Sequence, residues 1–324
     1  MISVKLAIRR FQRFVSTPHR TYAASTLRVG FGIITFLLYA MHWRQRLFLW
    51  GPNGQLDVGY YRLASGDYPL ALYGWFNTVG WTDLLYTAGM LVSILYAIGF
   101  VPRLTAIVFY VLTAALYDRN TLSLDGGNNV LILLSLYLCF ADTGRHFAIK
   151  TIRFPKLRRF YPIVLRPLNV IHNGAMATIA LQVAIVYFFS GTAKVMGHRW
   201  QDGTAIYYIM RVNEFSLPGL SHLIYENAIL VTFLTYSTIV FQVAFPFVMW
   251  FSRLKVPLFI AAIGFHVGVA TFMGLTAFST TLIVADIAIF SDRAFLTLVA
   301  NARSVIAFAR GAIGRRAIAV AETT

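Results

Sequence analysis

Charged residues are scarce in this sequence, and acidic residues are the scarcest. Of the 324 residues, 12% are charged and 58% are hydrophobic, whereas soluble globular domains average roughly 25% and roughly 45 to 50%. This composition argues against a water-soluble enzyme of this length. The 28 Lys and Arg residues outnumber the 12 Asp and Glu residues, and the net charge is +16. The positions of the surplus positive charges therefore need an explanation.

The sequence also has only one cysteine and none of the common catalytic motifs. The single cysteine, Cys139, excludes an intramolecular disulfide framework and any cluster of cysteine metal ligands. The seven histidines lack the spacing of metal ligands, and no phosphate loop, HExxH motif or G-x-S-x-G motif occurs. We therefore expect no metal. The basic residues fall between long uncharged runs and not along amphipathic elements, so we also expect no nucleic-acid partner.

Long apolar runs fill most of the chain. A helix needs about 20 mostly apolar residues to cross a hydrocarbon layer of about 30 Å, and about 17 can suffice. The clear runs are 25–43, 83–101, 170–191, 229–251 and 256–273. Three further runs are shorter or contain polar residues, namely 104–117, 126–142 and 276–290. The sequence therefore predicts an all-α integral membrane protein, a polytopic bundle of about eight transmembrane helices.

The basic residues predict how this bundle is oriented, because cytoplasmic connections collect Lys and Arg. With the N-terminus inside, the inner segments contain 20 of the 28 basic residues and three of the 12 acidic ones. The outer segments contain seven basic and eight acidic residues, and five of the six tryptophans lie at or near them. We therefore expect a multi-pass plasma-membrane protein with both termini in the cytoplasm.

The two ends of the chain mix basic and apolar residues. Residues 1–20 place Leu6, Phe11 and Phe14 among basic residues, which is typical of an amphipathic helix lying on the anionic lipid of the inner leaflet. Their apolar stretches are too short for a secretory signal. The expected organisation is an interfacial helix at 1–20, a transmembrane domain at 21–292 and a basic cytoplasmic tail at 293–324.

Polar residues near the apolar runs are the candidates for function, because polar groups in hydrocarbon are costly. Lys194 ends the segment YFFSGTAK, just past the run 170–191 and near the outer interface. A lysine that snorkels from a helix end is the plain alternative. However, Gly191 and Gly197 flank Lys194 as if the backbone approached a partner closely, and the charge rule disfavours a lysine on this side. An amine partly removed from water gives up its proton more easily, so Lys194 is a candidate base.

Other polar positions have both structural and functional interpretations. The segment SLDGGNN, which contains Asp125 and Asn129, is either a glycine-rich turn in which Asp125 caps the following helix or a polar mouth that opens into the bundle. His266, near the middle of the run 256–273, is a site candidate or an interhelical hydrogen-bonding residue. We expect Gln242 to make an interhelical contact. We expect Asp286, near the inner end of the last run, to reach water or a basic partner in a structural role.

The sequence resembles the HTTM (horizontally transferred transmembrane) domain family, the bacterial relatives of vitamin K-dependent γ-glutamyl carboxylase. The resemblance covers about residues 22 to 292. The segments that carry it are LRVGFG at 27–32, DGGNN at 125–129, YFFSGTAK at 187–194 with Trp200 and Gly203, and Phe265-His266 with Met273, Gly274 and Phe278. It implies a location in a bacterial inner membrane.

The resemblance also implies a chemistry. The carboxylase uses a lysine at the lumenal face to deprotonate vitamin K hydroquinone, and Lys194 matches that position. Oxygenation of the quinol then supplies the free energy to remove a weakly acidic C–H proton. On this hypothesis the cofactor is a hydroquinone of the vitamin K or menaquinol type, Lys194 is the base, and Asp125, Asn129, Trp200 and His266 shape the pocket.

One departure from the carboxylase leaves other functions open. The sequence lacks the large lumenal portion with which the carboxylase holds its protein substrate, so carboxylation of a protein is not implied. An alternative is a non-catalytic membrane subunit of a peptide maturation or export system, which would bind a peptide or protein partner through the outer segments 44–82 and 192–227. A solute transporter is less favoured, because the sequence shows no repeated halves.

Overall fold

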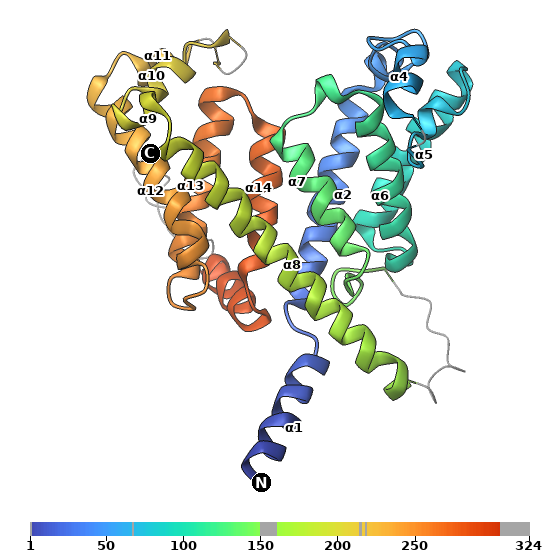
Figure 1. Cartoon of the computed structure of the whole chain (residues 1–324), viewed down its shortest axis with the longest axis vertical. Helices are drawn as coiled ribbons and strands as arrows, with labels where there is room; N and C mark the ends of the chain where they lie inside the picture. The colour runs from blue at the N-terminus through green and yellow to red at the C-terminus, as the bar shows by residue number, and fades with distance from the viewer. Residues whose placement is uncertain (1, 67, 150–160, 214–215, 218, 305–324) are drawn as a thin grey trace, which may run out of the picture.

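The protein is all-helical over the residues that the structure describes. The computed structural model describes residues 2–66, 68–149, 161–213, 216–217 and 219–304, and no strand occurs among them. The basic stretch 150–160 and most of the tail expected at 293–324 lie outside the described residues. Figure 1 shows two groups of helices, α2, α5, α6 and α7 in one and α12, α13 and α14 in the other, with α8 running diagonally between them.

Each of the eight apolar runs forms a helix. These helices are α2 (Thr21–Met41), α5 (Val79–Ile98), α6 (Pro102–Arg119), α7 (Gly126–Leu138), α8 (Tyr161–Val195), α12 (Ala228–Val248), α13 (Lys255–Met273) and α14 (Thr276–Asp286). The main differences from the expected ranges are that α8 begins earlier and that α14 ends at Asp286, where the 3₁₀ turn η6 (Ile287–Ile289) follows.

Among the described residues, five helical segments are long and apolar enough to cross a membrane. These segments are Leu6–Met41, Val79–Ile98, Pro167–Val195, Ala228–Val248 and Lys255–Met273. Two apolar helices are shorter, namely Gly126–Leu138 and Thr276–Ile289. The chain is therefore a membrane protein by the length and composition of its helices.

Short elements connect these helices at one end of the bundle. The connection between α2 and α5 contains η1 (Trp43–Gln45), α3 (Arg46–Trp50), α4 (Val58–Ser65) and η2 (Leu72–Gly74). The 3₁₀ turn η3 (Thr121–Ser123) precedes α7. The connection between α8 and α12 contains α9 (His198–Gln201), α10 (Ala205–Ile209) and α11 (His222–Tyr225). We call this the short-helix end. The N-terminal helix α1 (Ile2–Ser16) projects from the opposite end (Figure 1).

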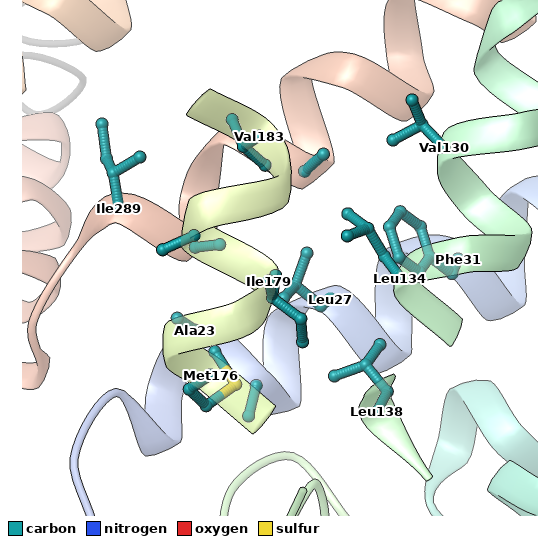
Figure 2. Packing of buried hydrophobic residues seen from close by; sticks show 14 of the residues in the cluster. Ala23, Leu27, Phe31, Val130, Leu134, Leu138, Met176, Ile179, Val183 and Ile289 are labelled. Carbon is teal, nitrogen blue, oxygen red and sulfur yellow. The ribbon is translucent and has the colours of Figure 1, made fainter. Parts of the chain in front are cut away.

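The hydrophobic core lies where α2, α7, α8 and α14 meet. Leu27 and Phe31 of α2 face Leu134 of α7 and Ile179 of α8 (Figure 2), and all four side chains are fully or almost fully buried. Figure 2 also shows Ala23, Val130, Leu138, Met176, Val183 and Ile289 around them. This core joins the two groups of helices, with α8 between them.

A buried arginine ties α2 to the end of α5. The guanidinium of Arg28 is fully buried, and it donates to the carbonyl oxygens of Tyr96 at 2.7 Å and Ala97 at 2.5 Å, where α5 ends. It also donates to the carbonyls of Thr143, His146 and Phe147 at 3.0, 3.2 and 2.6 Å, which lie in the loop that follows α7. A helix end leaves carbonyls without intrahelical partners and carries partial negative charge, so a cation there is favourable.

A second buried arginine organises the short-helix end. Arg119, at the end of α6, donates to the carbonyls of Gly51 and Leu56 at 2.5 and 2.6 Å. The next residue, Asn120, donates to the carbonyl of Leu49 at 2.9 Å and to Oε1 of Gln55 at 3.0 Å. The segment that contains α3 and α4 is therefore folded around the end of α6.

We predict that replacing Arg28 destabilises the whole bundle. In Arg28→Met several buried carbonyls lose their donor, each at a cost of about 1 to 3 kcal/mol, and in Arg28→Lys a single ammonium cannot reach five carbonyls. Thermal unfolding in detergent should show a midpoint lowered by about 5 °C or more for both variants. Arg103→Gln, at an exposed arginine of α6, is the control and should unfold like the wild type. Equal midpoints for all three variants would contradict the role given to Arg28.

Candidate functional site

Lys194 lies in the last turn of α8, at the short-helix end. Its Nζ donates to Oγ of Ser190 at 2.9 Å and to the carbonyl of Ser190 at 3.3 Å, and it lies 5.2 Å from the centroid of the Trp200 ring. The lysine is part-buried, and no carboxylate forms an ion pair with it within the described parts of the chain. The described groups that contact the amine are therefore neutral.

A close approach between α8 and α12 supports the position of Lys194. Ser190 Oγ donates to Oε1 of Gln242 on α12 at 3.1 Å, which confirms the expected interhelical contact of Gln242. One residue further along α8, a Cβ added at Gly191 would lie 2.9 Å from the backbone nitrogen of Val243. The absence of a side chain at Gly191 thus allows the two backbones to meet beside the lysine.

A hydrogen-bonded cluster of three titratable side chains lies deeper in the bundle. The hydroxyl of Tyr187 on α8 lies 2.9 Å from Nε2 of His266 on α13 and 2.9 Å from Oδ2 of Asp286 on α14. Tyr187 and His266 are each 2% exposed and Asp286 is 0% exposed. These three helices thus bring one phenol, one imidazole and one carboxyl group together away from water.

The expectation for Asp286 was wrong. The sequence suggested that this carboxylate reaches water or a basic partner near the inner end of the last run, but its side chain is fully buried and its recorded partner is Tyr187. The physical reason is that α14 places Asp286 on its inward face, toward α8 and α13. A position near the end of a helix does not by itself expose a side chain.

Two atoms of this cluster have no hydrogen-bond partner among the described residues. They are Nδ1 of His266 and Oδ1 of Asp286, both buried. The rings of Phe265 and Phe278 lie 5.0 and 5.9 Å from that of His266, and Phe245 stacks on Tyr187 at 3.9 Å. Buried polar atoms are almost always paired, so two unpaired atoms in one apolar site need an explanation.

Asp125 and Asn129 lie at the start of α7. Asp125 caps this helix by accepting from the backbone N–H of Asn128 at 2.9 Å, and the Asn128 side chain accepts from the N–H of Asp125 in return. The capping alternative is therefore confirmed for Asp125. Asn129 is exposed. The described contacts include no hydrogen bond from Asp125 or Asn129 to Lys194, Trp200 or His266. The start of α7 does approach α14, because a Cβ added at Gly126 would lie 3.3 Å from the Phe278 ring.

The structure thus groups the candidates differently from the sequence. It brings Lys194 together with Trp200, and it places His266 beside Tyr187, which lies on α8 seven residues before Lys194. Seven residues are nearly two helical turns, so Tyr187 and Lys194 lie on similar faces of α8, about 10 Å apart along its axis. The seven-residue spacing between Tyr187 and Lys194 is the feature of the sequence that marks Tyr187 as a candidate site residue. No sequence pattern pointed to Asp286 as its partner.

We predict that a methyl group at Gly191 disturbs the Lys194 site. The added Cβ of Gly191→Ala meets the backbone of α12, where overpacking costs about 1 to 3 kcal/mol. Thermal unfolding in detergent should show a lower midpoint. The control is Gly174→Ala on the same helix, where the added Cβ meets nothing within 4 Å and alanine favours the helix; its midpoint should stay equal or rise. A destabilised Gly174→Ala with an unaffected Gly191→Ala would contradict this packing.

Comparison with known proteins gives the family of the chain. It is 25% identical over 215 residues to the uncharacterized protein YitO of Bacillus subtilis (strain 168), a match that covers 61% of this chain and 63% of that protein. The chain therefore aligns with less than two thirds of this relative's length. No solved structure matches the chain. The model of the HTTM domain matches residues 20–294, and the chain belongs to the HTTM domain family.

Proposed function

We propose that this protein is a membrane enzyme that oxidises a hydroquinone with molecular oxygen and uses Lys194 as the base. The observation that carries the proposal is the neutral surroundings of Lys194. Its part-buried amine contacts a serine hydroxyl, a serine carbonyl and an indole ring. A lysine whose contacts include no carboxylate can exist as the free amine at lower cost than one held in an ion pair, and only the free amine is a base.

The residues around the site fit a ligand of this class. A hydroquinone of the vitamin K or menaquinol type has a flat aromatic ring with a hydroxyl group at each end. Trp200 near Lys194 and the rings of Phe265 and Phe278 near His266 offer aromatic surfaces. The unpaired Nδ1 of His266 and Oδ1 of Asp286 are polar atoms to which a hydroxyl group can bind.

The protein would contribute positioning and proton transfer. A bound hydroquinone supplies the electrons for the reduction of oxygen. Ser190, which is fixed by Gln242, orients Nζ of Lys194, and Nζ takes the proton of a ligand hydroxyl. The apolar helices around the site exclude water, which strengthens each of these electrostatic contacts.

The proposed enzyme is a multi-pass protein of a bacterial inner membrane, with eight spans and the short-helix end outside. Its support is the charge count along the sequence, because the connections at the opposite end hold most of the basic residues. There α1 carries Phe11 and Phe14, which are 68% and 63% exposed, among basic residues. A helix of this kind fits the anionic lipid of the inner leaflet.

A second candidate function has support at the short-helix end. Here Leu63, Trp75 and Phe76 are 83%, 58% and 57% exposed. A surface pocket of ≈ 520 Å³ lies nearby and is lined by Tyr61, Arg62, Ser65, Tyr68 and Trp75, among others. Exposed aromatic residues beside a pocket favour binding of a peptide or protein. In this alternative the protein is a non-catalytic subunit of a peptide maturation or export system, and Lys194 is not needed.

We predict that Lys194→Ala abolishes hydroquinone oxidation. Loss of a general base lowers a rate about 100-fold or more. Membranes that contain the protein are supplied with vitamin K hydroquinone or menaquinol under oxygen, and quinone and epoxide are quantified. Lys194→Arg is the matched control, because it keeps the positive charge but cannot be deprotonated. Both variants should be inactive. Yields equal to those of the wild type would refute the role of Lys194 and favour the non-catalytic subunit.

We predict that the short-helix end reacts with an impermeant thiol reagent in intact cells. In a Cys139→Ser background, single cysteines at the exposed positions Ala64 and Asn213 should be labelled. A cysteine at Ser252, exposed in the connection between α12 and α13, should be labelled only after the cells are opened. The reverse pattern would invert the proposed orientation and move Lys194 to the cytoplasmic side.

A further inference from the structure

The Tyr187 hydroxyl makes two hydrogen bonds but has only one proton to donate. Its partners are Nε2 of His266 and Oδ2 of Asp286, each at 2.9 Å. If Tyr187 donates to Asp286, then Nε2 of His266 must carry a hydrogen and donate to the Tyr187 oxygen. If Tyr187 donates to His266, then Oδ2 of Asp286 must carry a hydrogen and donate to the Tyr187 oxygen. The two arrangements differ by the concerted movement of protons along one chain of atoms.

The arrangement with a protonated Asp286 has no charged member. It consists of a carboxylic acid, a phenol and a neutral imidazole whose second hydrogen is on Nδ1. The other arrangement with the same number of protons separates a carboxylate from an imidazolium. Because buried charges are costly in apolar surroundings, the uncharged arrangement is favoured at rest.

No described charge close to the cluster reverses this preference. The helices packed around it are α2, α7, α8, α12, α13 and α14. Apart from the cluster itself and tyrosines, their ionisable residues are Arg28, Arg166, His172, Lys194 and Lys255. Arg28 and Lys255 donate to backbone carbonyls, His172 is bonded to the backbone of Asp142 and His19, and Lys194 contacts Ser190.

We propose that Tyr187, His266 and Asp286 form a buried proton relay that delivers one proton, from Nδ1 of His266, to an anionic oxygen of the bound ligand. Nδ1 releases its proton to that oxygen, the Tyr187 hydroxyl passes its proton to Nε2, and Asp286 passes its proton to the Tyr187 oxygen. Afterwards Asp286 is a carboxylate, Tyr187 is again a phenol and His266 is neutral with its hydrogen on Nε2. The cluster has lost one proton, and the ligand oxygen has gained it.

The unpaired atoms are consistent with this direction of transfer. Nδ1 is the exit of the relay, so it must be free to meet a ligand and cannot be bonded to a neighbouring helix. The nature of the acceptor rests on the proposed function, in which Lys194 removes a hydroxyl proton and molecular oxygen then takes up the electrons of the hydroquinone. The oxygenated ligand carries an anionic oxygen, and this oxygen accepts the proton of the relay. Tyr187 and Lys194 lie on similar faces of α8, so the base and the relay can act on one bound ligand.

Infrared spectroscopy of the purified protein tests the relay without any substrate. At neutral pH the wild type should show the C=O stretching band of a protonated carboxyl group in apolar surroundings. Asp286→Asn should lose this band, and Tyr187→Phe should shift it because the hydrogen bond is broken. Tyr187→Phe keeps the ring that packs against Phe245, so it provides a folded variant if Asp286→Asn does not fold.

An exposed carboxylate provides the control for this measurement. Asp202 accepts hydrogen bonds from the hydroxyl and backbone N–H of Thr204, which lower the pKa of Asp202. Asp202→Asn should therefore leave the band of the protonated carboxyl unchanged. A wild type without the band, or a band that remains in Asp286→Asn, would overturn the relay.

Kinetics distinguish proton delivery from a structural role. His266→Gln keeps an amide nitrogen in place of Nε2, so it can bond to Tyr187, but it cannot pass a proton onward. Hydroquinone oxidation should slow about 100-fold in His266→Gln and in Tyr187→Phe, and the solvent deuterium isotope effect of the wild type should change in both. Wild-type rates in these two variants would overturn delivery. Since the infrared test needs no substrate, it decides on the relay even if the wild type does not oxidise a hydroquinone.

Discussion

Polar groups inside an apolar bundle have no water to bind, and this constraint determines how the helices are connected. Arg28 is its clearest consequence. Its buried guanidinium donates hydrogen bonds to five carbonyls, two at the end of α5 and three in the loop after α7. An unpaired carbonyl in such a place is costly. One side chain of α2 therefore stabilises the packing of α2 against α5 and the position of the loop that leads to α8.

The same constraint makes the unpaired atoms around His266 informative. Where α5 and α6 end, Arg28, Arg119 and Asn120 supply donors to the carbonyls of the adjoining loops. In the cluster of Tyr187, His266 and Asp286, two buried polar atoms have no partner in the part of the chain that the structure describes. Such groups are seldom retained for stability alone. Buried polar atoms without a partner among the described residues also occur elsewhere, such as Nη1 of Arg119 and the hydroxyl of Tyr96. What distinguishes Nδ1 of His266 and Oδ1 of Asp286 is that they belong to one hydrogen-bonded cluster, and we propose that a ligand binds there.

The sequence predicted the helices well because length and hydropathy are local properties. All eight apolar runs form helices, and the family inferred from a few segments is confirmed by the match over residues 20–294. Gln242 and the capping alternative for Asp125 were also predicted, since interhelical glutamines and N-terminal caps follow local rules. The number of spans and their orientation stay predictions.

The candidate site was harder to predict because it depends on which faces of distant helices meet. Lys194 and His266 were singled out as unusual residues in apolar surroundings. Tyr187 was quoted only as part of a segment, because a tyrosine in such a run is unremarkable on its own. Asp286 was misplaced, since its burial depends on the rotation of α14 relative to α8 and α13 and not on its distance from the helix end.

The length of α8 has a consequence for what the protein can bind. This helix is unbroken from Tyr161 to Val195, and near its other end Asn173 is bonded to Val15 and Thr17 of the N-terminal segment. Lys194 and Tyr187 lie on the same unbroken helix, so the distance between their backbone positions is fixed. In the function we propose, α8 would therefore favour a ligand whose polar groups match the distance between its last turn and a point two turns deeper.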